Sequence, residues 1–215
     1  VVVLKSVTGE KTSRISEVLL SAVHPFTLML GKILGVAATA LVQAVIWGVC
    51  LALAGAYGAI LAHAAGADIS QYIPHVPPSL YVAFVFFFVL GFLLYASLYA
   101  AIGAMVSSDQ EAQQTQMPLT MLLVVGAYLA FLVMANPSST SSVVLSLIPF
   151  FAPILMLMRI AVSNPPAWQI AASLLLLLGT FLFFTRITAK IYRVGILMTG
   201  KRPTLPELLR WLRYA

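Results

Sequence analysis

The feature that most restricts the fold of this chain is a set of long segments without charged side chains. No charged residue occurs between Ile33 and Ala62. A helix needs about 20 apolar residues to cross roughly 30 Å of hydrocarbon, and there every backbone N–H and C=O must be paired within its own segment. Because only 8% of the residues are charged and 61% are hydrophobic, a soluble domain of this length is excluded. We expect an all-α, polytopic transmembrane helical bundle.

Four full spans are predicted, at about 33–62, 80–106, 118–135 and 167–190. A further apolar stretch, 143–162, contains Pro149 and Pro153, each of which removes a backbone donor and bends a helix. We interpret this stretch as a re-entrant or outer-surface hairpin that does not cross, which is tolerated where it is buried in protein or lines a cavity. The resulting division is a segment before the first span (1–32), a transmembrane domain (33–190) and a cytoplasmic tail (191–215).

The distribution of basic residues predicts the orientation. Of the 12 Lys and Arg residues, four precede the first full span, seven lie from Arg186 onward, and Arg159 alone lies between. By the positive-inside rule both ends of this fragment are cytoplasmic, which requires an even number of crossings. The cations lie beside apolar runs and form no basic domain, so they indicate membrane topology and no nucleic-acid partner.

An amphipathic segment precedes the first span. Between Gly9 and Val23 the apolar residues follow helical spacing, while Lys11, Arg14 and Glu17 fall on another face. The pattern predicts a short helix at the cytoplasmic surface that ends before Pro25. Such a helix either anchors the chain at the interface or docks as a lever onto a soluble partner, and the pattern leaves both open.

The same segment carries a family resemblance. The run VTGEKTSRISEVLLSAVHPFTLMLGKILGVA resembles the cytoplasmic segment of type-2 ABC (ABC-2) exporter permeases, particularly the sodium-extrusion branch, in which E-K-x-x-R-x-x-E-x-L-L precedes P-x-x-L-x-x-G-K. The stretches 109–118 and 189–214 are also similar to that branch. Gly9 departs from the pattern, because relatives commonly carry a second acidic residue there.

The resemblance implies a larger assembly. A first span, a large extracytoplasmic domain and most of a second span would precede Val1, and 1–4 would be the tail of that second span. The 10–23 helix would lie in a cleft of a separate ATP-binding cassette ATPase, with Glu10, Lys11, Arg14 and Glu17 as the ATPase-coupling residues. ATP and Mg²⁺ would be held by that ATPase. The working form would be a dimer, with a second permease copy or a homologue, in a bacterial plasma (inner) membrane.

The chain carries no evident catalytic chemistry of its own. It contains no G-x-x-x-x-G-K-[ST] phosphate loop, and its histidines at 24, 63 and 75 have no metal-ligand spacing. The spans offer no polar catalytic pair. We therefore expect a transport subunit that is not an enzyme and that binds no cofactor or metal itself.

Polar residues inside the spans are the candidates for a substrate path. Gln43, Ser97 and Tyr99 lie within apolar runs, where interhelical hydrogen bonding is the alternative role. Small residues spaced four apart also form two ridges that permit close helix packing, within the chain or across a dimer: Ala96, Ala100 and Ala104, and Gly48, Ala52 and Ala56.

These observations predict the membrane-spanning permease subunit of an ATP-driven exporter, for substrates such as sodium ions or hydrophobic drugs. An ion-coupled secondary transporter and a noncatalytic membrane scaffold are the alternatives. A secondary carrier usually places an ionisable residue near the midplane, and the four spans offer no clear one.

Overall fold

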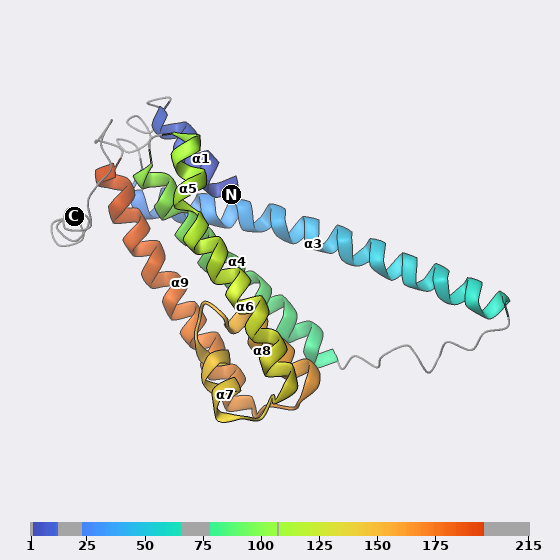
Figure 1. Cartoon of the computed structure of the whole chain (residues 1–215). Coiled ribbons are helices and arrows are strands. Elements are labelled where there is room, and N and C mark those ends of the chain that lie inside the picture. Colours follow the sequence, from blue (N-terminus) through green and yellow to red (C-terminus); the bar gives the residue numbers. More distant parts are fainter. Residues whose placement is uncertain (1, 13–22, 66–77, 107, 196–215) are drawn as a thin grey trace.

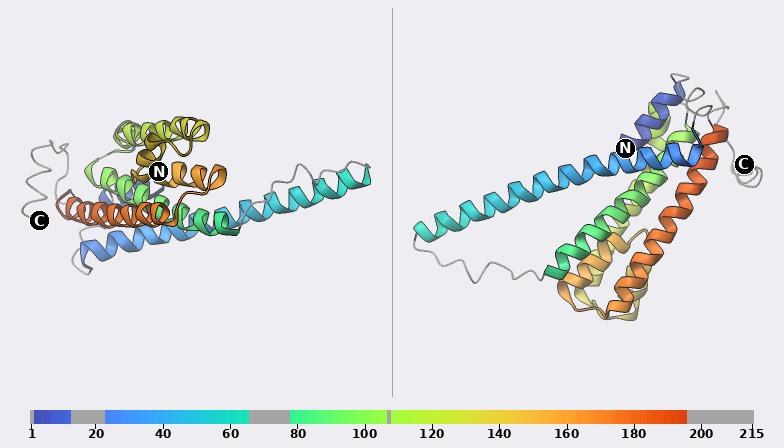
Figure 2. Two further views of the ribbon diagram at one scale, coloured as in Figure 1. Left: turned by 90° about the horizontal axis from the view of Figure 1, so that it is seen from below. Right: turned by 180° about the vertical axis from the view of Figure 1, so that it is seen from behind.

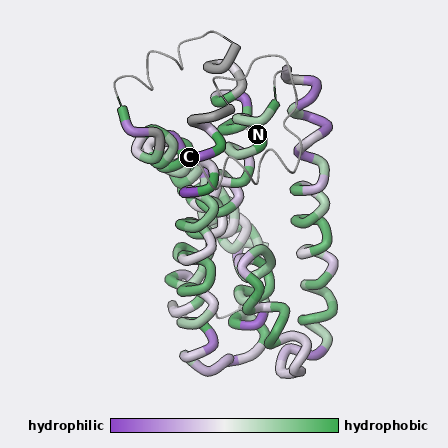
Figure 3. The backbone as a smooth tube through the Cα atoms, turned by 90° about the vertical axis from the view of Figure 1, so that its left-hand side faces the viewer, coloured by the Kyte–Doolittle hydropathy of each residue, from purple (hydrophilic) through white to green (hydrophobic). Residues whose placement is uncertain are grey.

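The computed structural model describes residues 2–12, 23–65, 78–106 and 108–195. Within these ranges every regular element is an α-helix, and four helices are long and apolar enough to cross a membrane. These four are α3 (Pro25–Ala64), α4 (Pro78–Met105), α6 (Met117–Ala135) and α9 (Ala167–Gly195). Hydrophobic residues run along the long helices, and hydrophilic residues gather toward their ends (Figure 3). The predicted all-α, polytopic membrane bundle is confirmed.

Helices α4 and α9 form the most extensive helix–helix contact of the described residues, with α9 along one edge of the bundle (Figure 1). The first ridge of small residues, Ala96, Ala100 and Ala104, is buried in the main hydrophobic core. Small side chains allow two helix backbones to approach closely. At this contact Thr188 Oγ1 donates a hydrogen bond to the carbonyl oxygen of Ser97 at 3.0 Å. The first ridge therefore packs within the chain.

Helix α3 begins earlier than the uncharged run that predicted it. It starts at Pro25, which suits a first turn because no backbone donor is needed there, and Nδ1 of His24 accepts from the N–H of Phe26 at 3.4 Å. Lys32 is accommodated inside the helix because its Nζ lies 5.8 Å from the ring centre of Tyr192. The 40-residue helix is about 60 Å long, so it extends well beyond the predicted span.

Only the first part of α3 packs on the bundle. Met29, Ile33 and Ala37 are buried, whereas the residues from Val45 to Gly58 are exposed. Figure 2 shows the helix diverging from its neighbours toward Ala64. The second small ridge (48, 52 and 56) lies on this exposed part. It therefore does not pack within the part of the chain that the structure describes.

Helix α1 (Val2–Thr12) is continuous through two segments that were predicted to be separate. Gly9, the expected start of the amphipathic helix, lies inside it. Leu4 is buried against α4, and a Cβ at Gly103 would lie 2.9 Å from the carbonyl oxygen of Leu4. Because glycine has no Cβ, α4 can approach the backbone of α1 closely at Gly103. Residues 13–22, most of the predicted amphipathic helix, lie outside the described residues.

The polar stretch between the predicted spans 80–106 and 118–135 contains the short helix α5 (Asp109–Thr115). Its N-cap is Ser108, whose Oγ accepts a hydrogen bond from the N–H of Glu111 at 3.3 Å. A capped turn of this kind is stabilised locally and needs no apolar face, which is why the hydropathy pattern alone did not reveal it.

The proline-containing stretch forms two short helices, α7 (Thr140–Leu147) and α8 (Ala152–Val162). Pro153 lies in the first turn of α8, and the backbone at Ile148 is extended where α7 ends. The 11 residues of α8 cover about 16 Å, roughly half of a bilayer core. This helical hairpin lies at the end of the bundle opposite to α1 and the C-terminal end of α9 (Figure 1).

Candidate functional site

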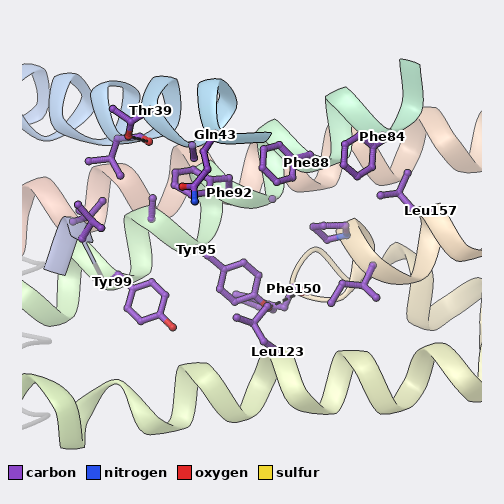
Figure 4. A pocket seen from close by; sticks show the side chains of 18 residues that line it. Thr39, Gln43, Phe84, Phe88, Phe92, Tyr95, Tyr99, Leu123, Phe150 and Leu157 are labelled. Carbon is purple, nitrogen blue, oxygen red and sulfur yellow. Dashed lines mark hydrogen bonds between the residues drawn. The ribbon is translucent and has the colours of Figure 1, made fainter. Parts of the chain in front are cut away.

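A half-open cavity of about 540 Å³ lies between the helices of the bundle (Figure 4). It is lined by residues of α1, α3, α4, α6, α8 and the connection between α7 and α8. None of the lining side chains is charged. Its volume lies in the range of sites for small organic molecules, about 300–1,000 Å³. The cavity is therefore the candidate functional site of the described residues.

Aromatic side chains of α4 form one wall. Phe84, Phe88 and Phe92 are spaced four residues apart, so they lie along one face of the helix. The ring centres of Phe84 and Phe88 are 5.6 Å apart with an interplanar angle of 20°, and those of Phe88 and Phe92 are 6.4 Å apart at 33°. Tyr95 and Tyr99 continue this wall. The wall offers a broad apolar surface on which another ring can pack.

Three of the four polar lining side chains have partners within the chain. Thr39 Oγ1 donates to the carbonyl oxygen of Val36 at 2.8 Å, and Tyr95 Oη donates to that of Phe150 at 2.8 Å. Tyr99 Oη lies 3.5 Å from the hydroxyl oxygen of Thr120.

Gln43 differs from the other three. Its side chain is exposed, points into the cavity in Figure 4, and has no hydrogen-bond partner among the described residues. It lies on a helix whose mean hydropathy suits the bilayer interior. An amide left unpaired in an apolar medium is costly, so a partner at this position would be bound favourably.

The hairpin closes the end of the cavity away from α1. An ideal Cβ at Gly91 of α4 would lie 2.5 Å from Cγ and 2.7 Å from Cβ of Pro153. A Cβ at Gly126 of α6 would lie 3.3 Å from the ring of Phe151. Together with the hydrogen bond from Tyr95 to Phe150, these contacts hold the hairpin tightly against α4 and α6.

A buried arginine joins the hairpin to the neighbouring ends of α6 and α9. Arg159 is 3% exposed. Its Nε donates to the carbonyl oxygen of Pro137 at 2.9 Å, Nη1 to Oγ of Ser146 at 2.9 Å, and Nη2 to Oε1 of Gln169 at 2.8 Å. Ser173 of α9 adds a bond from its Oγ to the carbonyl oxygen of Ser146 at 3.1 Å. One side chain thus links α7, α8, the start of α9 and the connection after α6.

The three residues predicted to form a substrate path fall in different places. Gln43 and Tyr99 line the cavity. Ser97 does not: it is fully buried, and its Oγ donates to the carbonyl oxygen of Leu94 at 2.7 Å. Its side-chain hydrogen bond lies within α4, and the interhelical bond at this residue is made by its carbonyl oxygen, which accepts from Oγ1 of Thr188. The other two keep their predicted role as a proposal.

The predicted ATPase-coupling residues cannot be placed as side chains. Arg14 and Glu17 lie outside the described residues, and Glu10 and Lys11 are described only as part of the helical backbone of α1. Their role remains a prediction from the sequence. Within the described ranges, no group of three or more His, Cys, Asp and Glu residues could hold a metal ion.

Two important features were not identified from the sequence. The i, i+4 spacing of Phe84, Phe88 and Phe92 was available, but that spacing does not distinguish a cavity wall from a packed core. Arg159 was noted as the lone cation between the first and last spans, and a lone charge of this kind in a membrane segment usually faces protein and is paired there. That rule could have identified it as a buried contact.

Comparison with known proteins gives consistent matches over most of the chain. Residues 1–190 match the sequence profile of the ABC-2 family transporter proteins. The uncharacterized protein YhaP of Bacillus subtilis (strain 168) is 32% identical over 211 residues, which cover 97% of this chain and 50% of YhaP. The uncharacterized protein MJ1024 of Methanocaldococcus jannaschii is 29% identical over 211 residues, 97% of this chain and 48% of MJ1024. The chain therefore spans about half the length of these relatives, and no solved structure matches.

Proposed function

The chain belongs to the ABC-2 family of transporter proteins, and from this premise we propose that it is the membrane-spanning subunit of an ATP-driven exporter whose substrate passes through the cavity beside α4. It is a multi-pass membrane protein and a transport subunit of that family. A separate ATP-binding cassette subunit binds ATP and Mg²⁺, and two permease copies or homologues form the working dimer. The sodium-extrusion branch of the family remains a prediction from the sequence.

The observation that carries this proposal is the uncharged, aromatic cavity between the helices of the bundle. A noncatalytic scaffold would have no need of a drug-sized space lined by rings. An ion-coupled carrier is disfavoured because such carriers place an ionisable or ion-coordinating group near the midplane, and no lining residue of this cavity is ionic.

The cavity lining also distinguishes between sodium ions and hydrophobic drugs, the two kinds of substrate predicted from the sequence. A sodium ion needs several oxygen ligands to replace its hydration shell, since the hydration of a hard cation is strong. The side-chain oxygens lining the cavity are few, those of Thr39, Gln43, Tyr95 and Tyr99, and none belongs to a carboxylate. A hydrophobic drug, in contrast, gains from contact with the aromatic wall. Between the two, the lining favours the drug.

The 10–23 helix is proposed to transmit ATPase closure to this cavity. A ligand or partner can shift a two-state bundle only through contacts that differ between the states, and a helix gripped by the ATPase provides such contacts. Support comes from the charged pattern of the segment and from the position of α1, whose Val2 and Val3 line the cavity. Movement of the cytoplasmic segment would thus reach the cavity wall directly.

The test is performed on the intact transporter. We expect an ATPase to copurify and to drive efflux of a hydrophobic compound from reconstituted vesicles. Reversal of both charges, Arg14→Glu with Glu17→Arg, should lower ATP-dependent transport by more than about tenfold, because unfavourable charge pairs at an interface cost several kcal/mol. The matched control reverses the charges of Lys201 and Glu207 in the tail (Lys201→Glu with Glu207→Lys). Transport that runs on an ion gradient without any ATPase would overturn the proposal.

The orientation proposed is that both ends of this fragment are cytoplasmic in a bacterial plasma membrane. It is supported by the distribution of Lys and Arg and by the position of α1 and the end of α9 at the same end of the bundle (Figure 1). A reporter enzyme inserted after Asn164, between α8 and α9, should be active only outside the cytoplasm. Activity of a cytoplasmic reporter at this position would contradict the topology.

A further inference from the structure

We infer that the cavity is a binding site for an uncharged aromatic molecule with one hydrogen-bonding group, and that Gln43 determines specificity by bonding to this group. The inference rests on the proposed function and adds a substrate class to it. It depends on three observations: the aromatic wall of α4, the lack of charge in the lining, and the unpaired amide of Gln43.

The aromatic wall selects a ring-bearing molecule. Phe84, Phe88 and Phe92 present rings along about two turns of α4, and Phe150 lies on the hairpin side. Apolar surface is favourable for any hydrophobic ligand, and ring contacts add to it. A cavity of about 540 Å³ holds a molecule of two or three rings, the size class for which such cavities are typical.

The lack of charge in the lining selects against ions. A permanent charge that enters an apolar site loses its hydration, and the loss is compensated only by a paired charge or by several hydrogen bonds. The aromatic faces attract a cation, but this attraction is smaller than the desolvation penalty of a permanent charge. The buried cation Arg159 is engaged by oxygen atoms of the hairpin region and is absent from the lining. Neutral molecules are therefore favoured over both cations and anions.

Gln43 selects for the hydrogen-bonding group. It is the one polar lining side chain for which the described residues provide no partner, and it projects into the cavity (Figure 4). A site that presents an unpaired polar group discriminates against ligands that leave that group unpaired. A ligand with an oxygen acceptor would receive a hydrogen bond from the Gln43 amide, whereas a pure hydrocarbon of the same shape would not.

Four probes with three phenyl rings each separate these contributions: triphenylphosphine oxide (neutral, one acceptor), triphenylmethane (neutral, no acceptor), methyltriphenylphosphonium (cation) and triphenylacetate (anion). Binding is measured with radiolabelled probes on the intact transporter with its ATPase in nanodiscs, and empty nanodiscs give the lipid background. We expect triphenylphosphine oxide to bind at least about tenfold more tightly than either ion.

Single-residue variants identify which side chains contact the probes. Gln43→Leu should weaken triphenylphosphine oxide by about threefold to tenfold, the usual range for one hydrogen bond, and leave triphenylmethane unchanged. Phe88→Ala should weaken both neutral probes, whereas Phe183→Ala, on the exposed face of α9 and outside the lining, should weaken neither. Equal binding of the oxide to wild type and Gln43→Leu, or tighter binding of an ion, would overturn the inference.

The probe-binding experiment and the efflux test can each give a negative result independently of the other. Probe binding without any copurifying ATPase would refute the proposed function and leave the site in place. ATP-driven efflux of some other compound, with no binding of triphenylphosphine oxide, would refute the substrate class alone. A cavity filled by another segment of the intact protein would appear as no binding of any probe, which also overturns the inference.

Discussion

We expect the Arg159→Met variant to lose about 3 kcal/mol of its free energy of unfolding, because the carbonyl oxygen of Pro137 and the side-chain oxygens of Ser146 and Gln169 lose their donor. Methionine fills a similar volume but donates no hydrogen bond. Each buried polar group left without a partner costs about 1–3 kcal/mol, and Ser146 loses least, since its Oγ also donates to the carbonyl oxygen of Val143 at 2.9 Å.

An opposing effect reduces this loss without cancelling it. Burying a guanidinium is itself costly, so its removal relieves a desolvation penalty. Here, however, the acceptors stay in place when the arginine is replaced, and an acceptor stripped of its donor is the unfavourable case. Arg159→Lys should give an intermediate result, because a single ammonium cannot reach three acceptors in the fork geometry of a guanidinium.

The measurement is thermal unfolding of the purified protein in detergent, followed by the fraction that remains monodisperse after heating. Arg186→Met is the matched control, because Arg186 is exposed on α9 and its replacement should change the free energy of unfolding by less than about 0.5 kcal/mol. Gln169→Glu should preserve stability, since a carboxylate can accept from the same guanidinium. If Arg159→Met unfolded at the wild-type temperature, the arginine would not be holding the hairpin.

The architecture was largely predictable from the sequence because hydrocarbon restricts the choice of fold so strongly. Continuous apolar runs must be helices there, and the observed α4, α6 and α9 follow the predicted spans closely. The break at 148–151 was predictable from Pro149 and Pro153. The start of α3 was not, since Lys32 was taken as the edge of the span, whereas the ring of Tyr192, far away in the sequence, accommodates its charge.

The site was predictable only in part, because a cavity is defined by what neighbouring helices fail to fill. Polarity inside apolar runs predicted Gln43, Ser97 and Tyr99 as candidates for a substrate path; Gln43 and Tyr99 line the cavity, whereas Ser97 is fully buried. The difference depends on helix rotation: α4 turns Ser97 toward α9 and Tyr99 toward the cavity. Rotation is set by packing contacts that no local pattern encodes.

Alanine at Gly91 should destabilise the protein, whereas alanine at most glycines of α3 should not. A Cβ at Gly91 would lie 2.5 Å and 2.7 Å from two ring carbons of Pro153, and a proline ring cannot rotate away. Either α8 or α4 must shift, at a cost of about 1–3 kcal/mol for overpacking of this kind. Because Gly91 and Pro153 both line the cavity, the shift should also weaken probe binding.

Gly58→Ala provides the control, because Gly58 lies on α3 away from the second small ridge. A Cβ at Gly58 has no atom within 4 Å, so alanine there should leave stability unchanged or raise it by about 0.5–1 kcal/mol through its better helix propensity. The contact itself is tested in a double-mutant cycle with Pro153→Gly, which removes both ring carbons. In that background the loss caused by Gly91→Ala should shrink by at least about 1 kcal/mol. If the two losses simply added, α8 would not be packed against α4 at this point, and the hairpin would have to be held mainly by Arg159.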